Sequence, residues 1–365
     1  MRAPVDKCSL RVVTPYGPDG GSSRVRVFDW LRWLDLNADI HDYLGWRNAD
    51  PAALVRQPGK VLRAELSLRT LPKTRAARLL LHREASPFSR GRLEQRLLSA
   101  AEFAIYDFDD ALQWDVGGGW ARRVAPKPRK CRFAVRSADR VIAGNDVLAD
   151  WASAFSRDVV MIPSCVDPSS YSRKRVYDLN DPPLLVWVGS PSTEQYLRLV
   201  EQPLLEINRR TGARIRLVSS GTTSLGPLDA MVDREQWTRH GAGQLLTGCD
   251  VAIAPLADGL YERGKCAYKI LEYAATGLPV VGSPIGANRL ALHRTGGTAA
   301  TRSDDWSEAL LALLSTSAEN RMRLGEKAYQ GVAQNYSFSA WSSSWLSAVG
   351  LGDKSNKELV ATEAY

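Results

Sequence analysis

Two successive series of short apolar segments, each alternating with helix-like stretches, constrain the fold of this chain more than any other feature. The first opens with the apolar segment 10–14, a loop with three glycines, and apolar residues at the helical positions 27, 30, 31 and 34. The second opens with the continuous apolar segment 184–188. Apolar strands between helices are typical of parallel sheets covered on both faces. The sequence therefore predicts an α/β protein of two Rossmann-like domains facing a cleft, with ligands beyond the carboxyl ends of the strands.

A polar stretch at residues 166–182 separates the two series. It is charged, contains proline and shows little apolar periodicity, so we interpret it as an interdomain linker. The first domain then spans residues 1–165 and the second spans residues 183–335. We expect a C-terminal helix at residues 336–350, and the polar tail at residues 351–365 is predicted to be disordered.

The composition is that of an ordinary globular protein with an excess of positive charge. Of 365 residues, 48 are Lys or Arg and 40 are Asp or Glu, which gives a formal net charge of +8. Such an excess is typical of proteins that bind nucleic acid, a membrane surface or an anionic small ligand. The basic residues are spread along the chain without interleaved aromatic residues, which argues against a nucleic-acid partner.

Three further features bear on location and on metal binding. No apolar run approaches the roughly 18 residues of a transmembrane helix, and the first residues lack the apolar region of a signal peptide. The five cysteines are scattered without a CxxC pair, so neither a disulfide scaffold nor a zinc site is indicated. We therefore expect a cytoplasmic protein without a bound metal, and the sequence does not indicate its oligomeric state.

The richest candidate site begins where a helix is predicted after the apolar segment 251–254. Gly264 allows backbone N–H groups to approach a phosphate, and the helix N-terminus adds positive potential. The neighbouring Lys265 can pair with a phosphate oxygen. Lys269 and Glu272 share a helix face, where the carboxylate can accept hydrogen bonds from vicinal sugar hydroxyls. The alternative is an exposed helix start with an ordinary ion pair.

This stretch resembles the carboxy-domain signature of GT-B glycosyltransferases of the family 4 type, in particular a bacterial subgroup that reads RGKxxxKxLEYMAxGxPVV. Further segments resemble the motifs of that subgroup in the same order, and together they cover about residues 10–345. These segments are Gly20–Arg26 (SSRxR), Tyr106–Asp110 (YDxDD), Ala143–Asn145 (AGN), Ile162–Asp167 (IPxxxD) and Trp187–Thr193 (WxGSPST).

The resemblance implies a fold and an activity. It implies two GT-B domains, a C-terminal helix that crosses back to the first domain, and transfer of a sugar from a nucleotide-diphosphate donor to an acceptor. It further implies retention of anomeric configuration and no required metal or other cofactor. Cationic side chains and backbone amides would stabilise the leaving diphosphate.

The sequence departs from the family pattern at the donor site. The family carries two glutamates eight residues apart; Glu272 matches the second, but Gly264 stands where the first belongs. We hypothesise that Arg263 and Lys265 take over the diphosphate charge.

A strand-to-helix turn early in the second domain adds three candidates. The amides and hydroxyls of Gly189, Ser190 and Thr193 suit a diphosphate. The alternative, which is compatible with the first, is plain helix capping by Ser192.

The first domain offers an acidic cluster after a predicted strand. Asp109 or Asp110 is a candidate to orient an acceptor hydroxyl or to accept its proton. The alternatives are a metal site that includes Asp107, which we disfavour, and a helix cap or a buried ion pair with an arginine.

The glycine-rich loop and a strand-end histidine complete the candidates. Gly21 permits close approach of donor or acceptor, and Arg24 and Arg26 are candidates for an acceptor phosphate. Pairing with an acidic neighbour is the alternative for Arg24, and an exposed helix surface is the favoured interpretation of Arg26. For His82 we favour a structural role.

A second basic region has two interpretations. Residues 69–83 and 90–98 hold arginines and lysines among leucines, which form either an interfacial surface at the inner face of a membrane or a solvated basic helix face. Other functions also stay open. These are a GT-B pseudo-glycosyl coupling enzyme, an epimerase and a nucleotide-sugar-binding protein without catalysis. A dinucleotide oxidoreductase is disfavoured because no G-x-G-x-x-G joins a strand to a helix.

Overall fold

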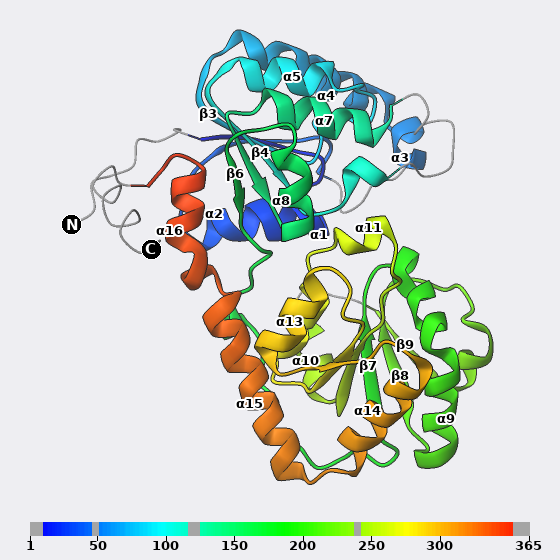
Figure 1. The fold of residues 1–365 in the computed structure, drawn as a ribbon. Helices are drawn as coiled ribbons and strands as arrows, with labels where there is room; N and C mark the ends of the chain where they lie inside the picture. Colours follow the sequence, from blue (N-terminus) through cyan, green and yellow to red (C-terminus); the bar gives the residue numbers. More distant parts are fainter. Residues whose placement is uncertain (1–9, 46–50, 116–124, 237–241, 353–365) are drawn as a thin grey trace. The chain divides into compact units, whose positions relative to one another are not determined.

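The computed structural model describes residues 10–45, 51–115, 125–236 and 242–352. By internal contacts the chain divides into two compact units (Figure 1). Unit 1 runs to Ser164 and resumes at Trp341, and unit 2 is Cys165–Ala340. The tail predicted at residues 351–365 lies outside the described residues from residue 353 onward.

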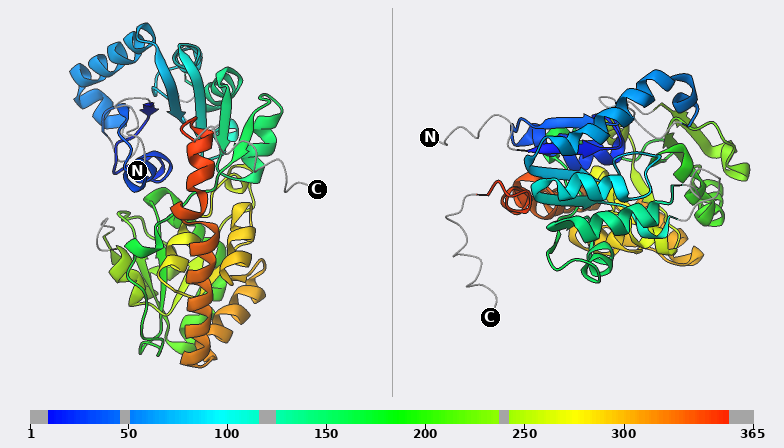
Figure 2. Two further views of the ribbon diagram at one scale, coloured as in Figure 1. Left: turned by 90° about the vertical axis from the view of Figure 1, so that its left-hand side faces the viewer. Right: turned by 90° about the horizontal axis from the view of Figure 1, so that it is seen from above.

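Unit 1 contains a six-stranded parallel sheet with the strand order β2-β1-β3-β4-β5-β6. The strands are β1 (Arg11–Thr14), β2 (Asp39–Asp42), β3 (Ala76–His82), β4 (Ala101–Phe108), β5 (Arg140–Ala143) and β6 (Val159–Met161). Consecutive side chains of the central strands are buried, for example Leu79 to Leu81 of β3. Because neighbouring side chains of a strand point to opposite faces, both faces of this sheet are covered (Figure 2).

The helical segments of unit 1 follow the strands as the sequence predicts. They are α1 (Gly21–Ser23), the π-helical η1 (Arg24–Phe28), α2 (Asp29–Trp33), α3 (Pro51–Arg56), α4 (Pro58–Thr70), η2 (Leu71–Lys73), α5 (Arg92–Ser99), η3 (Leu112–Trp114), α7 (Lys127–Ser137) and α8 (Asp146–Ser153). The C-terminal helix α16 (Phe338–Ala348) begins in unit 2 and continues into unit 1. There Trp345 stacks on Trp30 with ring centroids 5.2 Å apart, so the expectation of a returning helix is confirmed.

Unit 2 contains a second six-stranded parallel sheet, with the order β12-β11-β10-β7-β8-β9. Its strands are β7 (Leu184–Val188), β8 (Arg214–Val218), β9 (Val232–Glu235), β10 (Val251–Ala254), β11 (Val280–Gly282) and β12 (Thr298–Ala299). Its helical segments are η4 (Pro168–Ser170), η5 (Pro191–Val200), α9 (Glu201–Thr211), η6 (Gly226–Met231), α10 (Ala242–Thr247), α11 (Leu260–Arg263), α12 (Tyr268–Ala275), α13 (Ala287–Thr295), α14 (Ser303–Ser315) and α15 (Ala318–Asn335). One apolar cluster includes Ile270 of α12 and Val332 of α15, and another includes Ile207 of α9 and Trp306 of α14. The prediction of two parallel α/β units is therefore confirmed.

The segment predicted to be a linker, residues 166–182, is instead built into unit 2. The Lys174 N–H donates to the Thr276 carbonyl at 2.8 Å, and the Tyr177 hydroxyl donates to the Gly277 carbonyl at 2.8 Å. A β-bridge joins Val166 to Ser337. The low apolar periodicity reflects a strap held by hydrogen bonds rather than a chain that merely connects two domains.

The strand order locates the crevice of each sheet. In unit 2 the chain moves outward from β7 to β8 and β9, and then from β10 to β11 and β12 on the other side. The order therefore reverses between β7 and β10, and ligands of such sheets bind beyond the carboxyl ends of the strands at that point. In unit 1 the reversal falls between β1 and β3. The loops after these four strands are the first places to look for a site.

Candidate functional site

The carboxyl end of β7 holds a glycine that packing requires. A Cβ on Gly189 would lie 2.4 Å from Cη2 of Trp187 and 2.9 Å from Cε of Lys269, so no larger residue fits without displacing them. The Lys269 Nζ lies 5.0 Å from the centroid of the Trp187 ring. The structure thus brings two of the predicted site residues, Gly189 and Lys269, together at the reversal point of the sheet.

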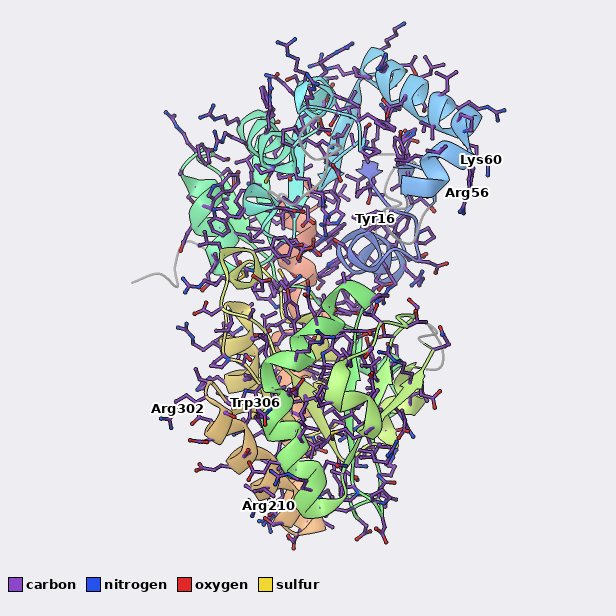
Figure 3. All side chains as sticks on the ribbon, turned by 90° about the vertical axis from the view of Figure 1, so that its right-hand side faces the viewer. Tyr16, Arg56, Lys60, Arg210, Arg302 and Trp306 are labelled. Atoms are coloured by element: carbon purple, nitrogen blue, oxygen red, sulfur yellow. The ribbon has the colours of Figure 1, made fainter. Side chains whose placement is uncertain are left out.

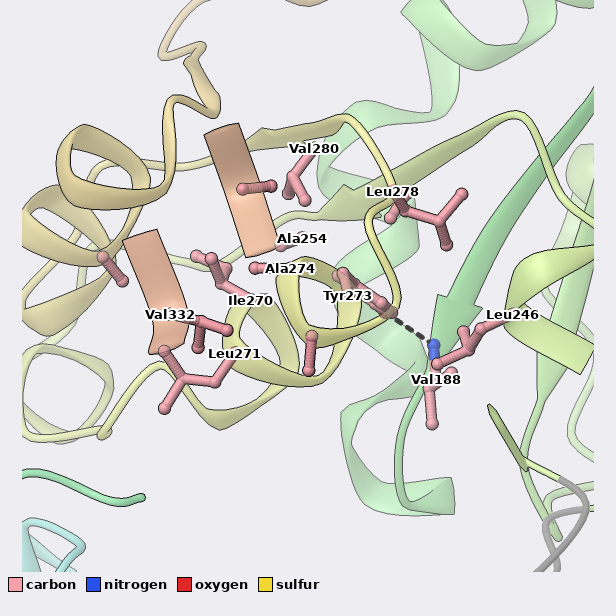
Figure 4. Close-up of a cluster of buried hydrophobic side chains, with 14 of the residues drawn as sticks. Val188, Leu246, Ala254, Ile270, Leu271, Tyr273, Ala274, Leu278, Val280 and Val332 are labelled. Carbon is pink, nitrogen blue, oxygen red and sulfur yellow. Dashed lines mark hydrogen bonds between the residues drawn. The ribbon is translucent and has the colours of Figure 1, made fainter. Parts of the chain in front are cut away.

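Helix α12 is fixed to the end of β7 by a buried hydrogen bond. The Val188 N–H donates to the Tyr273 hydroxyl at 2.8 Å, and both residues are buried (Figure 4). Ile270, Leu271 and Ala274 of the same helix lie in the apolar cluster that Figure 4 shows. Sequence analysis missed Tyr273, whose position among apolar residues gave no sign of a polar role.

The turn after β7 exposes the predicted hydroxyls. The Ser190 and Thr193 hydroxyl oxygens lie 3.3 Å apart, and the Thr193 hydroxyl also donates to the Ser190 carbonyl at 2.9 Å. The residue that precedes the helical segment η5 is Ser190, so capping by Ser192 is wrong. Segment η5 is a 3₁₀-helix that starts with Pro191.

The predicted helix start at Gly264 requires a correction. The Gly264 N–H donates to the Tyr261 carbonyl at 3.2 Å, and the Lys265 N–H donates to the Glu262 carbonyl at 3.0 Å, so both amides close α11. Helix α12 starts only at Tyr268. These two amides therefore do not form the phosphate cradle that the sequence suggested.

The predicted cations are placed differently from one another. The Arg263 guanidinium pairs with Asp258 at 2.6 Å, where both side chains are about half exposed. This pair lowers the pKa of the Asp258 carboxyl and raises the pKa of Arg263. The Lys265 Nζ lies 4.8 Å from the centroid of the Tyr261 ring, and Lys269 lies in the first turn of α12. Lys269, rather than Arg263, is thus the predicted cation nearest to Gly189.

Two carboxylates connect the loops of unit 2 through tyrosines. The Tyr196 hydroxyl of η5 donates to Oε1 of Glu262 in α11 at 2.7 Å, which ties the loop after β7 to the loop after β10. Burial and the Glu262 carboxylate raise the pKa of Tyr196, so the hydroxyl stays a donor. The predicted residue Glu272 accepts from Tyr171, which belongs to the strap of residues 166–182, at 3.4 Å. Sequence analysis did not predict either tyrosine.

In unit 1 the ends of β3 and β4 carry a buried ion pair with a histidine. His82 and Asp107 are neighbours in the strand register, and His82 Nδ1 lies 2.7 Å from Asp107 Oδ1. Arg26 holds the same carboxylate with two hydrogen bonds, at 2.6 and 3.2 Å, and also donates to the Ile162 carbonyl at 2.8 Å. The expectation that Arg26 is exposed is wrong, since it is 2% exposed. Burial alone would raise the pKa of Asp107, but Arg26 and His82 together hold it below its usual value.

The two predicted acidic residues lie beside this pair. The Ser22 hydroxyl lies 2.8 Å from His82 Nε2 and 2.7 Å from both carboxylate oxygens of Asp109. Arg83 donates to Asp110 at 2.8 Å and lies 3.4 Å from Asp109. The predicted alternative of an ion pair with an arginine therefore holds for Asp110. Both side chains keep some exposure, 13% for Asp109 and 21% for Asp110.

The remaining predictions in unit 1 divide. Gly21 is exposed and a Cβ there would meet no atom within 4 Å, so packing does not require a glycine. Arg24 pairs with Asp29 at 3.2 Å, as its structural alternative predicted. Within the ranges described, no three His, Cys, Asp or Glu side chains are grouped to hold a metal ion. The helices of those ranges also lack the length and hydrophobicity needed to cross a bilayer.

Comparison with protein families identifies the second unit. Residues 182–316 match the family described as glycosyl transferases group 1. The chain is a glycosyltransferase. None of the curated protein sequences matches the chain significantly.

Solved structures with the GT-B fold share the architecture of this glycosyltransferase. HepE of Anabaena, in complex with UDP and glucose, has a TM-score of 0.65 at 14% identity, with 94% of this chain and 99% of that chain covered. WaaG, a glycosyltransferase involved in lipopolysaccharide biosynthesis, has a TM-score of 0.61 at 14% identity, with coverage of 93% and 99%. The UDP-forming α,α-trehalose-phosphate synthase of Burkholderia vietnamiensis has a TM-score of 0.62 at 13% identity, with 93% of this chain and 99% of that chain covered. These likenesses establish the fold, which confirms the GT-B prediction.

Proposed function

We propose that this glycosyltransferase moves a sugar from a nucleotide-diphosphate sugar to an acceptor, and that unit 2 binds the donor beyond the carboxyl ends of β7 and β10. The observation that carries the proposal is the meeting of Gly189 and Lys269 at the reversal point of the sheet. The nucleotide and sugar held by HepE, a protein of the same fold, support a uridine diphosphate sugar as the donor.

The proposed site supplies groups that can stabilise the departing diphosphate. As the bond between sugar and phosphate breaks, negative charge develops on the leaving group, and a positioned cation lowers the barrier. Gly189 packs against Trp187 and Lys269 at the end of β7, and this packing keeps the Lys269 side chain beside the turn where we propose that the diphosphate binds. In this proposal the hydroxyls of Ser190 and Thr193 supply further donors, and Glu272, which lies on α12, accepts hydrogen bonds from sugar hydroxyls. We propose transfer with retention and with these side chains, rather than a metal, as the charge-stabilising groups.

The experiment compares Lys269→Ala with Arg210→Ala. Arg210 is an exposed cation on α9 that pairs with Glu206 (Figure 3), and it serves as the matched loss of charge in the same unit. A hydrogen bond to a charged group contributes about 1.5–3 kcal/mol, so Lys269→Ala should lower kcat/KM by roughly 10- to 150-fold. Arg210→Ala should leave it unchanged. Full turnover and donor affinity in Lys269→Ala would refute the assignment.

The roles of the other two cations need their own variants. We keep the hypothesis that Arg263 and Lys265 carry diphosphate charge, although Arg263 also pairs with Asp258. If both Arg263→Ala and Lys265→Ala kept full turnover, neither residue would have a role in the mechanism. Undiminished turnover after exhaustive treatment with EDTA is expected, and a loss restored by one divalent cation would contradict metal independence.

Product analysis separates the other candidate chemistries. Transfer releases one nucleoside diphosphate for each glycosylated acceptor, whereas an epimerase leaves the nucleotide sugar intact with an altered sugar. A pseudo-glycosyl coupling enzyme joins a donor that is not a true sugar. A binding protein without catalysis would raise the melting temperature with the donor but give no turnover with any acceptor.

A second proposal concerns a membrane surface on unit 1, and it moves the surface away from residues 69–83, one of the two segments that the sequence suggested. Residues 76–82 form the buried strand β3, so the segment 69–83 is not an interfacial helix. Helices α3 and α4 instead expose Val55, Leu62 and Leu66, with relative exposures of 80%, 60% and 52%. Basic side chains lie on the same helices, and Figure 3 labels Arg56 and Lys60 there. An amphipathic basic surface of this kind fits anionic lipid headgroups.

Flotation with vesicles tests the surface. Leu62→Glu should abolish binding to vesicles that contain phosphatidylglycerol, and Leu290→Glu, an exposed leucine on α13 of unit 2, is the matched control. No binding of the unaltered protein to these vesicles at low salt would discard the proposal.

A further inference from the structure

Five groups in unit 1 form a continuous hydrogen-bonded chain that the donor chemistry does not use. It runs from Arg26 to Asp107, to His82, to Ser22 and to Asp109. The His82 ring is 0% exposed and Asp107 is 1% exposed, whereas the Asp109 end keeps contact with solvent. The hydrogen-bonded chain therefore connects a partly exposed carboxylate, Asp109, to the buried ion pair of Arg26 and Asp107.

The hydrogen-bonding capacities of these groups leave one proton to be shared. Arg26 bonds to the Asp107 carboxylate, which accepts the Nδ1–H of His82 and so fixes the ring tautomer. The Ser22 hydroxyl can donate only once, yet it lies within hydrogen-bonding distance of both His82 Nε2 and Asp109. Either Nε2 is protonated and Ser22 donates to Asp109, or Nε2 is bare, Ser22 donates to the ring and the proton sits on Asp109. The two arrangements differ by one proton transfer through Ser22 Oγ.

We infer that Ser22 and His82 form a proton relay, which removes from Asp109 the proton that Asp109 accepts from the acceptor hydroxyl. The inference rests on the proposed transfer reaction. The acceptor oxygen bonds to the anomeric carbon on the face from which the diphosphate leaves, which preserves the anomeric configuration. Its O–H bond breaks and the proton passes to Asp109, while the diphosphate leaves with the electron pair of its bond to the sugar. Asp109 passes a proton to Ser22 Oγ as the Ser22 proton moves to His82 Nε2. The imidazolium is stabilised by Asp107, and the proton returns to solvent by the same path after product release.

The same order of serine, histidine and aspartate occurs in hydrolases that use serine as a nucleophile. Here a carboxylate oxygen of Asp109 lies 2.7 Å from Ser22 Oγ. A negative charge at that distance opposes the oxyanion that forms when serine attacks an acyl group. The geometry therefore points to proton transfer rather than to acyl transfer.

The charges around the ring come from every neighbouring element. The groups in or next to the relay are Arg26 of η1, Ser22 of α1, Asp107 of β4, Arg83 after β3, and Asp109 and Asp110 after β4. Tyr16 also lies near these charges: burial raises its pKa, Arg83 lowers it, and Glu84, Asp110 and Asp109 raise it. Glu84 itself pairs with Lys130. Asp109 is the catalytic group in this scheme, and Ser22 and His82 act through it as positioning and relay residues.

The kinetic test uses Ser22→Ala and His82→Gln. The control is Ser23→Ala, which removes the next hydroxyl of the same helix; Ser23 Oγ bonds to Thr14 rather than to the ring. Both relay variants should lower kcat for transfer by at least tenfold and abolish or displace the acid limb of its pH profile, with the donor KM within twofold of the unaltered protein. Ser22→Thr should restore the profile, and Ser23→Ala should keep it. An unchanged profile in Ser22→Ala would overturn the relay.

A measurement without turnover keeps the inference separable from the proposed function. NMR titration of the His82 ring nitrogens, assigned among four histidines by His82→Gln, should show His82 and the Asp109 carboxyl titrating as one coupled pair. In Ser22→Ala the two groups should titrate independently. Independent titration in the unaltered protein would refute the relay, whereas coupled titration without transfer to any acceptor would instead refute the proposed transfer reaction.

Discussion

The hydrogen bond between Val188 and Tyr273 gives a prediction whose size follows from the structure. Tyr273→Phe removes one hydroxyl from a fully buried position and leaves the ring in place. The Val188 N–H, at the last residue of β7, then loses the acceptor that it meets at 2.8 Å (Figure 4). Val188 is 4% exposed and Tyr273 is 0% exposed, so the amide lies in a buried environment.

An orphaned buried donor costs about 1–3 kcal/mol of unfolding free energy. For a domain the size of unit 2, each kcal/mol lowers the melting temperature by roughly 2–4 °C. Tyr273→Phe should therefore lower the melting temperature of unit 2 by about 2–12 °C. Since the same bond holds α12 against the turn that contains Gly189, donor affinity should fall as well, by up to about tenfold for each 1.4 kcal/mol that binding must restore.

The assay combines calorimetry of the whole chain with titration of the nucleotide sugar. Tyr177→Phe is the matched control, because its hydroxyl bonds to the Gly277 carbonyl in the same unit but away from β7. Both variants should melt earlier, and only Tyr273→Phe should bind the donor more weakly. A melting temperature equal to that of the unaltered protein would refute the energetic argument, and equal donor affinity would refute the coupling of α12 to the turn.

Three further outcomes test other buried groups. Gly189→Ala should cost about 1–3 kcal/mol by calorimetry, because its Cβ would overlap the Trp187 ring, and a stable variant with normal donor affinity would contradict this. Burial raises the pKa of Glu94, so the stability that this carboxyl contributes is present below about pH 4.5 and is lost as the pH rises through the folded-state pKa. Glu94→Gln should therefore gain stability relative to the unaltered protein as the pH rises. If urea unfolding gave the two proteins parallel curves of unfolding free energy against pH, the argument would be refuted. The pKa of Asp107 is lowered, so the stability that this carboxylate contributes is present above about pH 4 and is lost as the pH falls through the folded-state pKa. Asp107→Asn should lower the free energy of unfolding by roughly 3–5 kcal/mol at pH 7, because Arg26 stays buried without its partner. This difference from the unaltered protein should shrink in acid.

Local patterns in the sequence were sufficient to predict most strands and helices, and the loops that carry the candidate site residues. Strands β1 and β7 were visible as apolar runs, and Gly189, Lys269 and Asp109 were predicted as site residues because they follow predicted strands or occupy a helix face. Such patterns depend only on residues within a few positions of one another. The strap of residues 166–182 escaped this logic, because its hydrogen-bonding partners lie about a hundred residues away in the chain.

The sequence by itself determined that this chain builds two parallel α/β units, and it predicted an anion-binding site after the strands of the second. Only the tertiary structure decided which charges are available. It buried Arg26 against Asp107, paired Arg263 with Asp258, and set Ser22, His82 and Asp109 in one hydrogen-bonded line. Those contacts join residues up to 87 positions apart. They depend on strand order and register, which the pattern of apolar residues within one segment does not encode.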